Sequence, residues 1–137
     1  MGLTLMVMPD PSFSTPADSV HFRVEKEVAY LSPERSEKAD LYSPLEIPEG
    51  GRLPAMVVIH GGGFRVGQKD NDREINICGH LARHGYVALT IDYALADEGK
   101  PEWPRQLHDC KTAVRWLRAN AERLHIDPDR IGVMGGS

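Results

Sequence analysis

The stretch V-V-I-H-G-G-G-F, residues 57–64, joins a short apolar run to three successive glycines. The run at residues 55–59 is continuous rather than alternating, which is typical of a strand buried on both faces of a parallel sheet. Glycines directly after such a strand let the backbone turn sharply and leave its N–H groups unshielded. The stretch therefore predicts an α/β fold with an anion or oxyanion loop at the end of one strand.

The glycine loop departs from the two common nucleotide-binding patterns. Residues 62–67 nearly fit the phosphate-binding pattern G-x-x-x-x-G-K-[ST], but Gln68 stands where the lysine is required. In the dinucleotide pattern G-x-G-x-x-G, Val66 occupies the position of the third glycine. A nucleotide-dependent enzyme is therefore disfavoured, and no cofactor is predicted.

The residues before the loop predict an antiparallel pair of strands. Alternation over residues 21–31 indicates a half-buried strand, and residues 38–42 are its expected short partner. Prolines and a glycine pair in residues 43–54 indicate turns. The side chains expected on one face of the first strand are Phe22, Val24, Val28 and Tyr30.

The residues after the loop alternate between helical and strand patterns. Helices are predicted over residues 70–84 and 104–124, and strands over residues 86–93 and 130–135. Together with residues 55–59 they form a parallel β-α-β-α-β unit. The inward stripes of the two helices are expected to contain Ile75, Cys78, Leu81 and Ala82 in the first, and Leu107, Cys110, Val114, Leu117 and Leu124 in the second.

Residues at the helix ends support these boundaries. Asp70 or Asn71 is a candidate N-cap for the first helix, and Gly85 suits the position after its end. Pro104 suits the first position of the second helix, which Asp127 and Pro128 are expected to stop.

The sequence Gly135-Gly136-Ser137 follows the last predicted strand. It matches the first half of G-x-S-x-G, in which small neighbours let a strained turn expose the serine oxygen. Taken alone, G-G-S is equally typical of a turn. Its place after the third parallel strand favours the nucleophile interpretation.

Four ordered stretches carry a family resemblance: residues 57–64, L-T-I-D-Y-A-L-A at 89–96, H-D-C-K-T-A-V-R-W-L-R-A-N-A at 108–121 and I-D-P-D-R-I-G-V-M-G-G-S at 126–137. With them the chain resembles α/β-hydrolase esterases and lipases of the hormone-sensitive-lipase-like H-G-G-G group. It also looks like bacterial carbohydrate-ester, feruloyl and acetyl esterases. The resemblance implies the N-terminal portion of an α/β-hydrolase fold: antiparallel strands 1 and 2, then the parallel unit, ending at the nucleophile elbow.

The resemblance also implies roles for individual residues. Ser137 would be the catalytic nucleophile, the N–H groups of Gly62 and Gly63 would form part of the oxyanion hole, and His60 and Asp92 would anchor loops. The family order is Ser, then Asp or Glu, then His, so none of the six histidines in the chain inherits the catalytic role. The chain has Ala94 where the family often has Arg, which leaves the usual anchoring of that loop unexplained.

The implied function is a serine carboxylic-ester hydrolase that acts through an acyl-enzyme on short-chain or carbohydrate-linked esters. A serine without its base is a poor nucleophile, so residues 1–137 alone are expected to be inactive or nearly so. The alternative is a non-catalytic α/β-hydrolase-like protein that binds a small molecule. A histidine after the last strand of the domain distinguishes the two.

The composition excludes several classes of partner. The chain has 137 residues and a formal net charge of -4, so it lacks a basic footprint for nucleic acid. Its apolar runs are far shorter than the roughly 18 to 20 residues that span a bilayer. Residues 1–8 contain no Lys or Arg and are followed by prolines, so no signal peptide is predicted. This slightly favours a cytoplasmic location and leaves secretion open.

Composition and the resemblance together divide the chain into two parts. Residues 1–19 are predicted to be an irregular arm, because Pro, Ser and Asp dominate residues 9–19. Residues 20–137 are predicted to be the N-terminal part of a single α/β-hydrolase domain. A parallel core ending at its last strand leaves a sheet edge and apolar faces uncovered, so we expect the remainder of the domain or a complementing chain to cover them. A homo-oligomer stays open.

Cysteines and paired histidines indicate no metal site. Cys78 and Cys110 fall on helices expected on opposite faces of the sheet, so a disulfide is excluded and both are expected to be core thiols. His80 and His84 have a spacing that can hold a metal, but the H-E-x-x-H glutamate and a third ligand are missing. We expect two solvated histidines.

Overall fold

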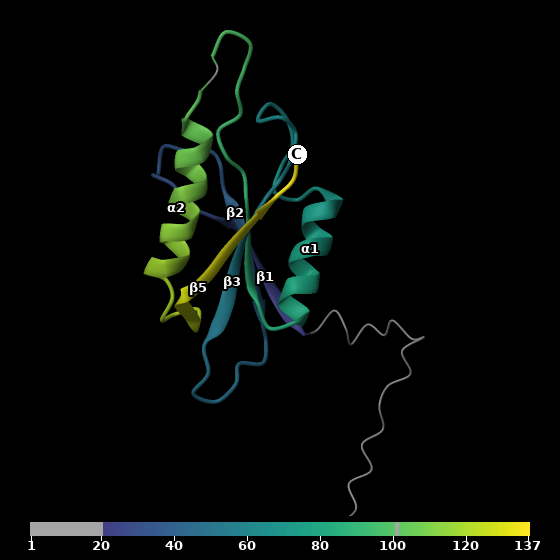
Figure 1. Cartoon of the computed structure of the whole chain (residues 1–137), viewed down its shortest axis with the longest axis vertical. Helices are drawn as coiled ribbons and strands as arrows, with labels where there is room; N and C mark the ends of the chain where they lie inside the picture. Colours follow the sequence, from purple (N-terminus) through teal and green to yellow (C-terminus); the bar gives the residue numbers. More distant parts are fainter. Residues whose placement is uncertain (1–20, 101) are drawn as a thin grey trace, which may run out of the picture.

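The computed structural model describes residues 21–100 and 102–137 (Figure 1). The predicted arm at residues 1–19 lies outside the described residues. The elements follow in the order β1 (Phe22–Val28), β2 (Ala39–Pro44), β3 (Leu53–Ile59), α1 (Asp72–Arg83), β4 (Val87–Ile91), α2 (Arg105–Ala119) and β5 (Ile126–Gly135).

The strands form one mixed sheet in the order β1-β2-β4-β3-β5. β1 pairs antiparallel with β2, and β2 pairs antiparallel with β4. β3 lies between β4 and β5 and is parallel to both. This confirms the predicted antiparallel pair followed by a parallel β-α-β-α-β unit.

The two helices cover opposite faces of the sheet (Figure 1). Ala113 and Leu117 of α2 belong to the larger apolar cluster, which also contains Val57 and Leu89. Cys78 of α1 belongs to a second cluster on the other face. Cys110 packs against the first cluster and is half-buried, and both cysteines are free, as the prediction of separate faces requires.

The alternation predicted for the first strand is broken by a bulge. The register shifts between Glu25 and Val28, and Glu27 adopts a φ of 59°. An extra residue in one strand reverses which face the following side chains occupy. Phe22 therefore packs in the α1 cluster and Val28 in the α2 cluster, which corrects the prediction that they share one face. Val24 is exposed, because β1 is an edge strand.

The second helix ends earlier than predicted, at Ala119 rather than residue 124. The side-chain amide of Asn120 donates to the Trp116 carbonyl, and the chain then turns through residues 120–125. Such local side-chain bonds compete with continuation of a helix. Leu124 stays in the core from within this turn.

Asp127 and Pro128 lie inside β5, so the prediction that they stop the helix is wrong. Pro128 is tolerated there because it lies between the pairs Leu53–Ile126 and Ala55–Ile131, where the register with β3 shifts and no regular ladder bond is lost.

Other boundaries shift by a few residues. Asn71 is the N-cap of α1 but makes no side-chain capping bond, and Gly85 has the positive φ expected after the helix, 87°. Pro104 precedes α2 as its N-cap instead of occupying its first turn. Ile75 and Leu107, predicted to point inward, are exposed.

Candidate active site

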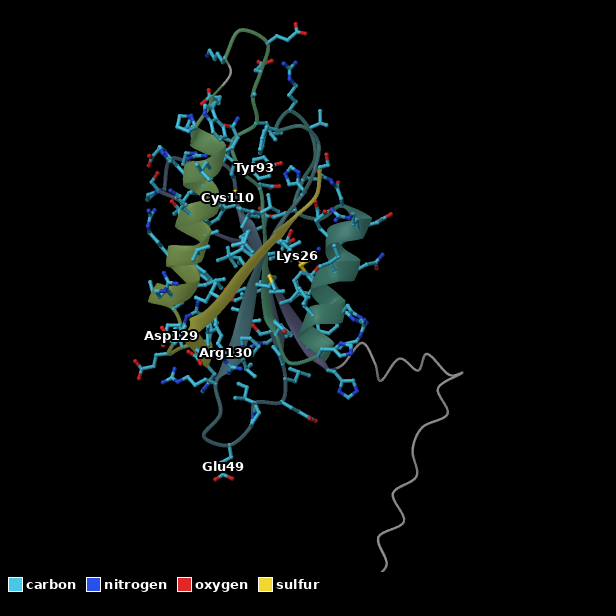
Figure 2. The ribbon with its side chains drawn as sticks, in the orientation of Figure 1. Lys26, Glu49, Tyr93, Cys110, Asp129 and Arg130 are labelled. Atoms are coloured by element: carbon cyan, nitrogen blue, oxygen red, sulfur yellow. The ribbon has the colours of Figure 1, made fainter. Side chains whose placement is uncertain are left out.

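The two glycine motifs of the sequence meet at the carboxyl ends of β3 and β5. The Gly136 N–H donates to the Ile59 carbonyl at 3.0 Å, and the Gly62 N–H donates to the Ser137 carbonyl at 3.2 Å. Ser137 is exposed. Asp129 and Arg130 of β5 lie at the opposite end of the molecule from Tyr93, which follows β4 (Figure 2). The parallel strands therefore bring the oxyanion-loop candidate and the nucleophile candidate into contact.

Close backbone approach explains why glycines occupy these positions. A Cβ at Gly61 would overlap the Ser137 carbonyl oxygen. A Cβ at Gly136 would overlap Nη1 of Arg73 and come within 3.2 Å of the Gly61 nitrogen. Because two backbones touch here, larger residues would push the serine away from the loop.

The tip of the glycine loop, residues 62–66, forms a tight turn. The Gly62 carbonyl accepts the N–H groups of Arg65 and Val66 at 3.1 and 3.2 Å. Gly63 has a φ of 61° and is exposed. Among the hydrogen bonds of residues 21–100 and 102–137, none is donated by the Gly63 N–H. That donor is therefore available to an external oxygen, whereas the Gly62 N–H already holds one.

His60 lies at the start of the loop and is buried. Its ring stacks on Tyr93 with centroids 4.3 Å apart, and its Nδ1 donates to the Gly61 carbonyl at 2.8 Å. Burial raises the pKa of Tyr93 to about 12, so its hydroxyl stays protonated and donates to the His60 carbonyl at 2.8 Å. The stacked pair holds the loop against the end of β4, which fits the anchoring role implied for His60.

Asp92 holds the other end of the loop. Its Oδ1 accepts the Lys69 N–H at 2.7 Å, and its own N–H donates to the Lys38 carbonyl at 2.9 Å. Its carbonyl accepts the Tyr30 hydroxyl. Burial raises the pKa of the Asp92 carboxyl, although the hydrogen bond from Lys69 opposes this. Asp92 therefore links the exit of the glycine loop to the segment between β1 and β2.

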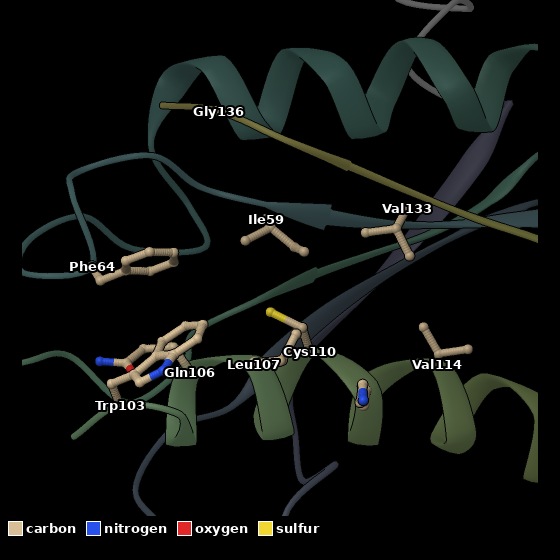
Figure 3. Close-up of a pocket in the computed structure, with 10 residues that line it drawn as sticks. Ile59, Phe64, Trp103, Gln106, Leu107, Cys110, Val114, Val133 and Gly136 are labelled. Carbon is tan, nitrogen blue, oxygen red and sulfur yellow. The ribbon is translucent and has the colours of Figure 1, made fainter.

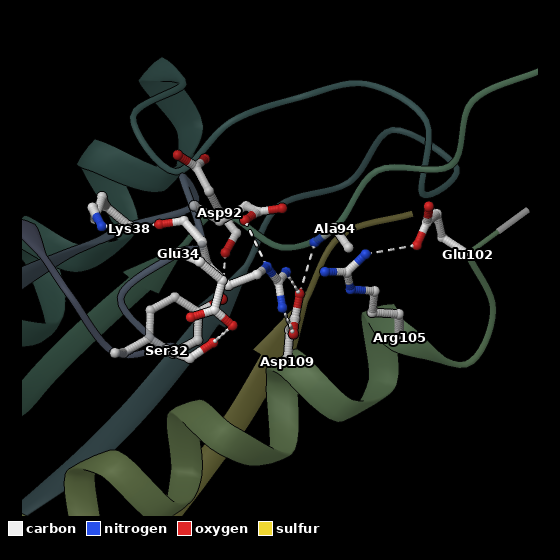
Figure 4. Close-up of polar contacts among 11 residues, drawn as sticks. Ser32, Glu34, Lys38, Asp92, Ala94, Glu102, Arg105 and Asp109 are labelled. Carbon is white, nitrogen blue, oxygen red and sulfur yellow. Dashed lines mark hydrogen bonds and ion pairs between the residues drawn. The ribbon is translucent and has the colours of Figure 1, made fainter. Parts of the chain in front are cut away.

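Asp109 and Arg35 were not found by the sequence analysis, and they anchor the loop after β4 (Figure 4). Oδ2 of Asp109 accepts the Ala94 N–H at 2.8 Å. The Arg35 guanidinium donates to both carboxylate oxygens of Asp109, at 3.1 and 2.7 Å. The hydrogen bond to Asp109 helps to raise the pKa of Arg35 above its usual value. These contacts hold the loop whose usual arginine is replaced by Ala94. The only local sign of this role in the sequence is that Asp109 directly precedes Cys110, a residue predicted to face inward from α2.

That loop also supports the tip. The Ala96 N–H donates to the Phe64 carbonyl at 2.7 Å. The ion pair of Arg35 and Asp109 therefore acts on the glycine loop through residues 94–96.

An apolar cavity of about 390 Å³ opens beside the two motifs (Figure 3). Phe64 and Trp103 lie at one end, Val114 and Val133 at the other, and Gly136 lines it next to Ser137. Burial raises the pKa of the Cys110 thiol, which also lines the cavity, to about 11, so it is protonated at neutral pH. The cavity offers apolar contacts to a group held near Ser137.

The described part of the chain contains no group of three or more His, Cys, Asp or Glu side chains arranged to hold a metal ion. His80 and His84 are exposed on α1 with ring centroids 4.3 Å apart, as predicted for solvated histidines. None of the helices in the described residues is long and apolar enough to cross a membrane.

The architecture is that of the α/β-hydrolase fold. An esterase from Pyrobaculum calidifontis is 34% identical, with a TM-score of 0.69 over 84% of this chain and 35% of its own. Brefeldin A esterase, a bacterial homologue of human hormone-sensitive lipase, is 26% identical, with a TM-score of 0.69 over 90% of this chain and 34% of its own.

The family is shown by the sequence itself. The BD-FAE family model matches residues 39–137, well over half of the chain, so the chain belongs to the BD-FAE family. Versiconal hemiacetal acetate esterase of Dothistroma septosporum is 37% identical over 90 residues, which are 65% of this chain and 26% of that protein. The chain thus spans about a quarter of the length of that curated relative.

Proposed function

We propose that the protein is a serine carboxylic-ester hydrolase and that Ser137 is its nucleophile. The observation that carries the proposal is the hydrogen bond between the Gly62 N–H and the Ser137 carbonyl, which joins the glycine loop to the serine, next to an apolar cavity lined by Gly136. The names of the relatives, which are esterases, support the same reaction.

The reaction proceeds in two steps. Oγ of Ser137 loses its proton to a base and attacks the ester carbonyl carbon, and the carbonyl electron pair moves to the oxygen. The N–H groups of Gly62 and Gly63 stabilise this oxyanion. For this, the Gly62 N–H gives up its hydrogen bond to the Ser137 carbonyl and donates to the oxyanion instead. The carbon–oxygen ester bond then breaks, the alcohol leaves with the proton, and an acyl-serine remains. Water attacks the acyl-serine in the same way and releases the acid.

The residues between 1 and 137 supply only part of this machinery. The His60 ring stacks on Tyr93 and its Nδ1 bonds the Gly61 carbonyl, which fits a residue that anchors the loop rather than a general base. By the family order, the histidine base and its carboxylate partner follow Ser137 in the chain.

Short-chain or carbohydrate-linked esters are the proposed substrates. The cavity of about 390 Å³ accommodates a small apolar group beside Gly136.

Hydrolysis of p-nitrophenyl acetate and of acetylated sugars by the intact protein tests this function. We expect Ser137→Ala to lower kcat by roughly 10⁴-fold or more without loss of stability, because the acyl-enzyme cannot form. Ser32→Ala is the matched control, since that exposed hydroxyl contacts only Glu34 in the described residues. Full activity in Ser137→Ala contradicts the proposal. A folded protein that binds esters without hydrolysing them supports the non-catalytic binding protein instead.

A further inference from the structure

Lys69 is a buried lysine two residues beyond the last glycine of the loop. Its side chain is 7% exposed, and its Nζ lies 2.6 Å from Oε1 of Glu27 and 3.4 Å from Oδ1 of Asp40. Asp40 is buried in β2, and Glu27 belongs to the bulge in β1. The Lys69 side chain therefore ties the exit of the glycine loop to the antiparallel strands.

The backbone of Lys69 is held as well. Its N–H donates to Oδ1 of Asp92 at 2.7 Å, and its carbonyl accepts the buried Thr90 hydroxyl at 2.8 Å. Burial alone would lower the pKa of Lys69, but the hydrogen bond to Glu27 and the nearby carboxylates raise it, so the ammonium stays charged. Both the main chain and the side chain of this residue are thus fixed.

The bulge in β1 is part of the same network. Glu27 has a φ of 59°, which a residue with a Cβ adopts rarely, and its N–H donates to Oδ1 of Asp40 at 3.1 Å. Buried ion pairs contribute little net stability, because desolvation of the charges offsets their attraction. The strained bulge at Glu27 and the buried pair of Lys69 and Asp40 therefore indicate that this network holds the exit of the glycine loop in place rather than stabilising the fold.

Movement at Lys69 would reach the serine through backbone contacts. A Cβ at Gly67 would overlap Nδ1 of His60 and the Gly61 carbonyl, so Gly67 lies directly against both. Gly61 in turn lies against the Ser137 carbonyl. A shift of residues 67–69 is therefore passed to the start of the loop and to the serine.

We propose that Lys69, held by Asp40 and Glu27, is a positioning residue that sets the place of the oxyanion N–H groups relative to Ser137. This inference rests on the proposed esterase function. Lys69 touches no reacting atom and acts only through the glycine loop. Its loss is expected to weaken binding of the transition state more than binding of the substrate.

The test uses the double variant Lys69→Met/Asp40→Asn in the intact protein. It removes the buried ammonium together with the buried Asp40 carboxylate that faces it, and the new side-chain amide at position 40 keeps an oxygen to accept the Glu27 N–H. Since removal of a whole oxyanion donor costs 10²- to 10³-fold, we expect partial displacement to lower kcat about tenfold with KM nearly unchanged. The inhibition constant of an alkylboronic acid, which forms a tetrahedral serine adduct, is expected to rise by about the same factor.

Two variants serve as controls. Lys69→Arg keeps the charge and is expected to restore most of kcat. Lys26→Met makes the same substitution at an exposed residue of β1 and is expected to leave kcat unchanged.

Each outcome separates this inference from the proposed function. An active wild type and an equally active double variant overturn the role of Lys69 alone, and so does a loss of kcat that matches the unfolded fraction. A wild type without esterase activity overturns the function as well.

If the double variant does not fold, Glu27→Gln decides, because the Glu27 side chain is 65% exposed and its replacement is compatible with folding. Amide hydrogen exchange in residues 60–67 is then expected to be about threefold faster, and unchanged exchange overturns the inference.

Discussion

The tip and the base of the glycine loop differ in almost every physical respect. The tip, residues 62–66, carries Phe64 and Val66, which are 47% and 64% exposed, and it is held by backbone bonds to Ser137 and Ala96. The base consists of His60 and residues 67–69. His60 and Lys69 are 1% and 6% exposed and make stacking, ionic and hydrogen-bond contacts.

The difference teaches that the two parts of the loop have separate roles: the base fixes the loop to the sheet, and the tip contains the N–H groups proposed to bind the oxyanion. The base touches β4 and the β1–β2 pair, so its contacts form when the domain folds. The tip presents the Gly63 N–H, which donates to no acceptor among the described residues, beside the Gly62 N–H that is bonded to Ser137. Substitutions in the base should therefore change stability and activity together, whereas substitutions in the tip should change activity with little effect on stability.

A pair of glycine substitutions tests this separation with the largest expected effect. Gly67→Ala places a Cβ against His60 and Gly61 at a φ of 106°, so we expect a loss of about 3 kcal/mol or more in the free energy of unfolding. Gly63→Ala has nothing within 4 Å of its Cβ and costs only the left-handed backbone, about 1 kcal/mol. Urea unfolding of both variants measures the difference, and equal losses would refute the division into tip and base.

The support behind the tip is tested by Arg35→Met. The substitution leaves the carboxylate of Asp109, whose side chain is 4% exposed, without its cation. Breaking a buried pair in this way costs about 3 kcal/mol, and Asp109→Asn in the same chain should recover much of it. Thermal unfolding of the single and double variants checks the recovery. A single variant as stable as the wild type would show that the ion pair does not hold residues 94–96.

The smallest expected effect on stability belongs to the tip residue Phe64. Phe64→Ala removes a half-exposed ring, so the free energy of unfolding should fall by less than about 1 kcal/mol. Because the ring lines the cavity, we expect KM for an apolar acyl ester to rise several-fold while kcat changes less. Steady-state kinetics with acetyl and butyryl esters measure both. A large loss of stability with unchanged KM would contradict the account of the tip.

The sequence predicted the parallel unit, and the family resemblance implied that the glycine loop and Ser137 act on the same substrate group. The apolar runs at β3, β4 and β5 are local signals, and the carboxyl ends of parallel strands meet at one edge of a sheet, so Gly62 and Ser137 had to lie near each other. His60 and Asp92 were found only through the family resemblance. Their contacts with Tyr93 and Lys69 fit that anchoring role, which stays a prediction.

The residues that the sequence did not reveal depend on distant partners. Lys69 bonds Glu27 across 42 positions and Asp109 bonds Arg35 across 74, and neither pair leaves a periodic signal. The bulge at Glu27 has the same origin, since it reflects the position of Asp40 on the neighbouring strand. The early end of α2 depends on one local bond of Asn120, which helical spacing of apolar residues does not register.

Labelling of the intact, folded protein with a fluorophosphonate, followed by mass spectrometry of the protein and its peptides, tests the central claim most directly. The reagent bonds covalently only to a serine that is activated as a nucleophile and held beside oxyanion donors. We expect one adduct per chain, on the peptide that contains Ser137. A folded protein that stays unlabelled, or that is labelled at another serine, would contradict the assignment of Ser137 as the nucleophile.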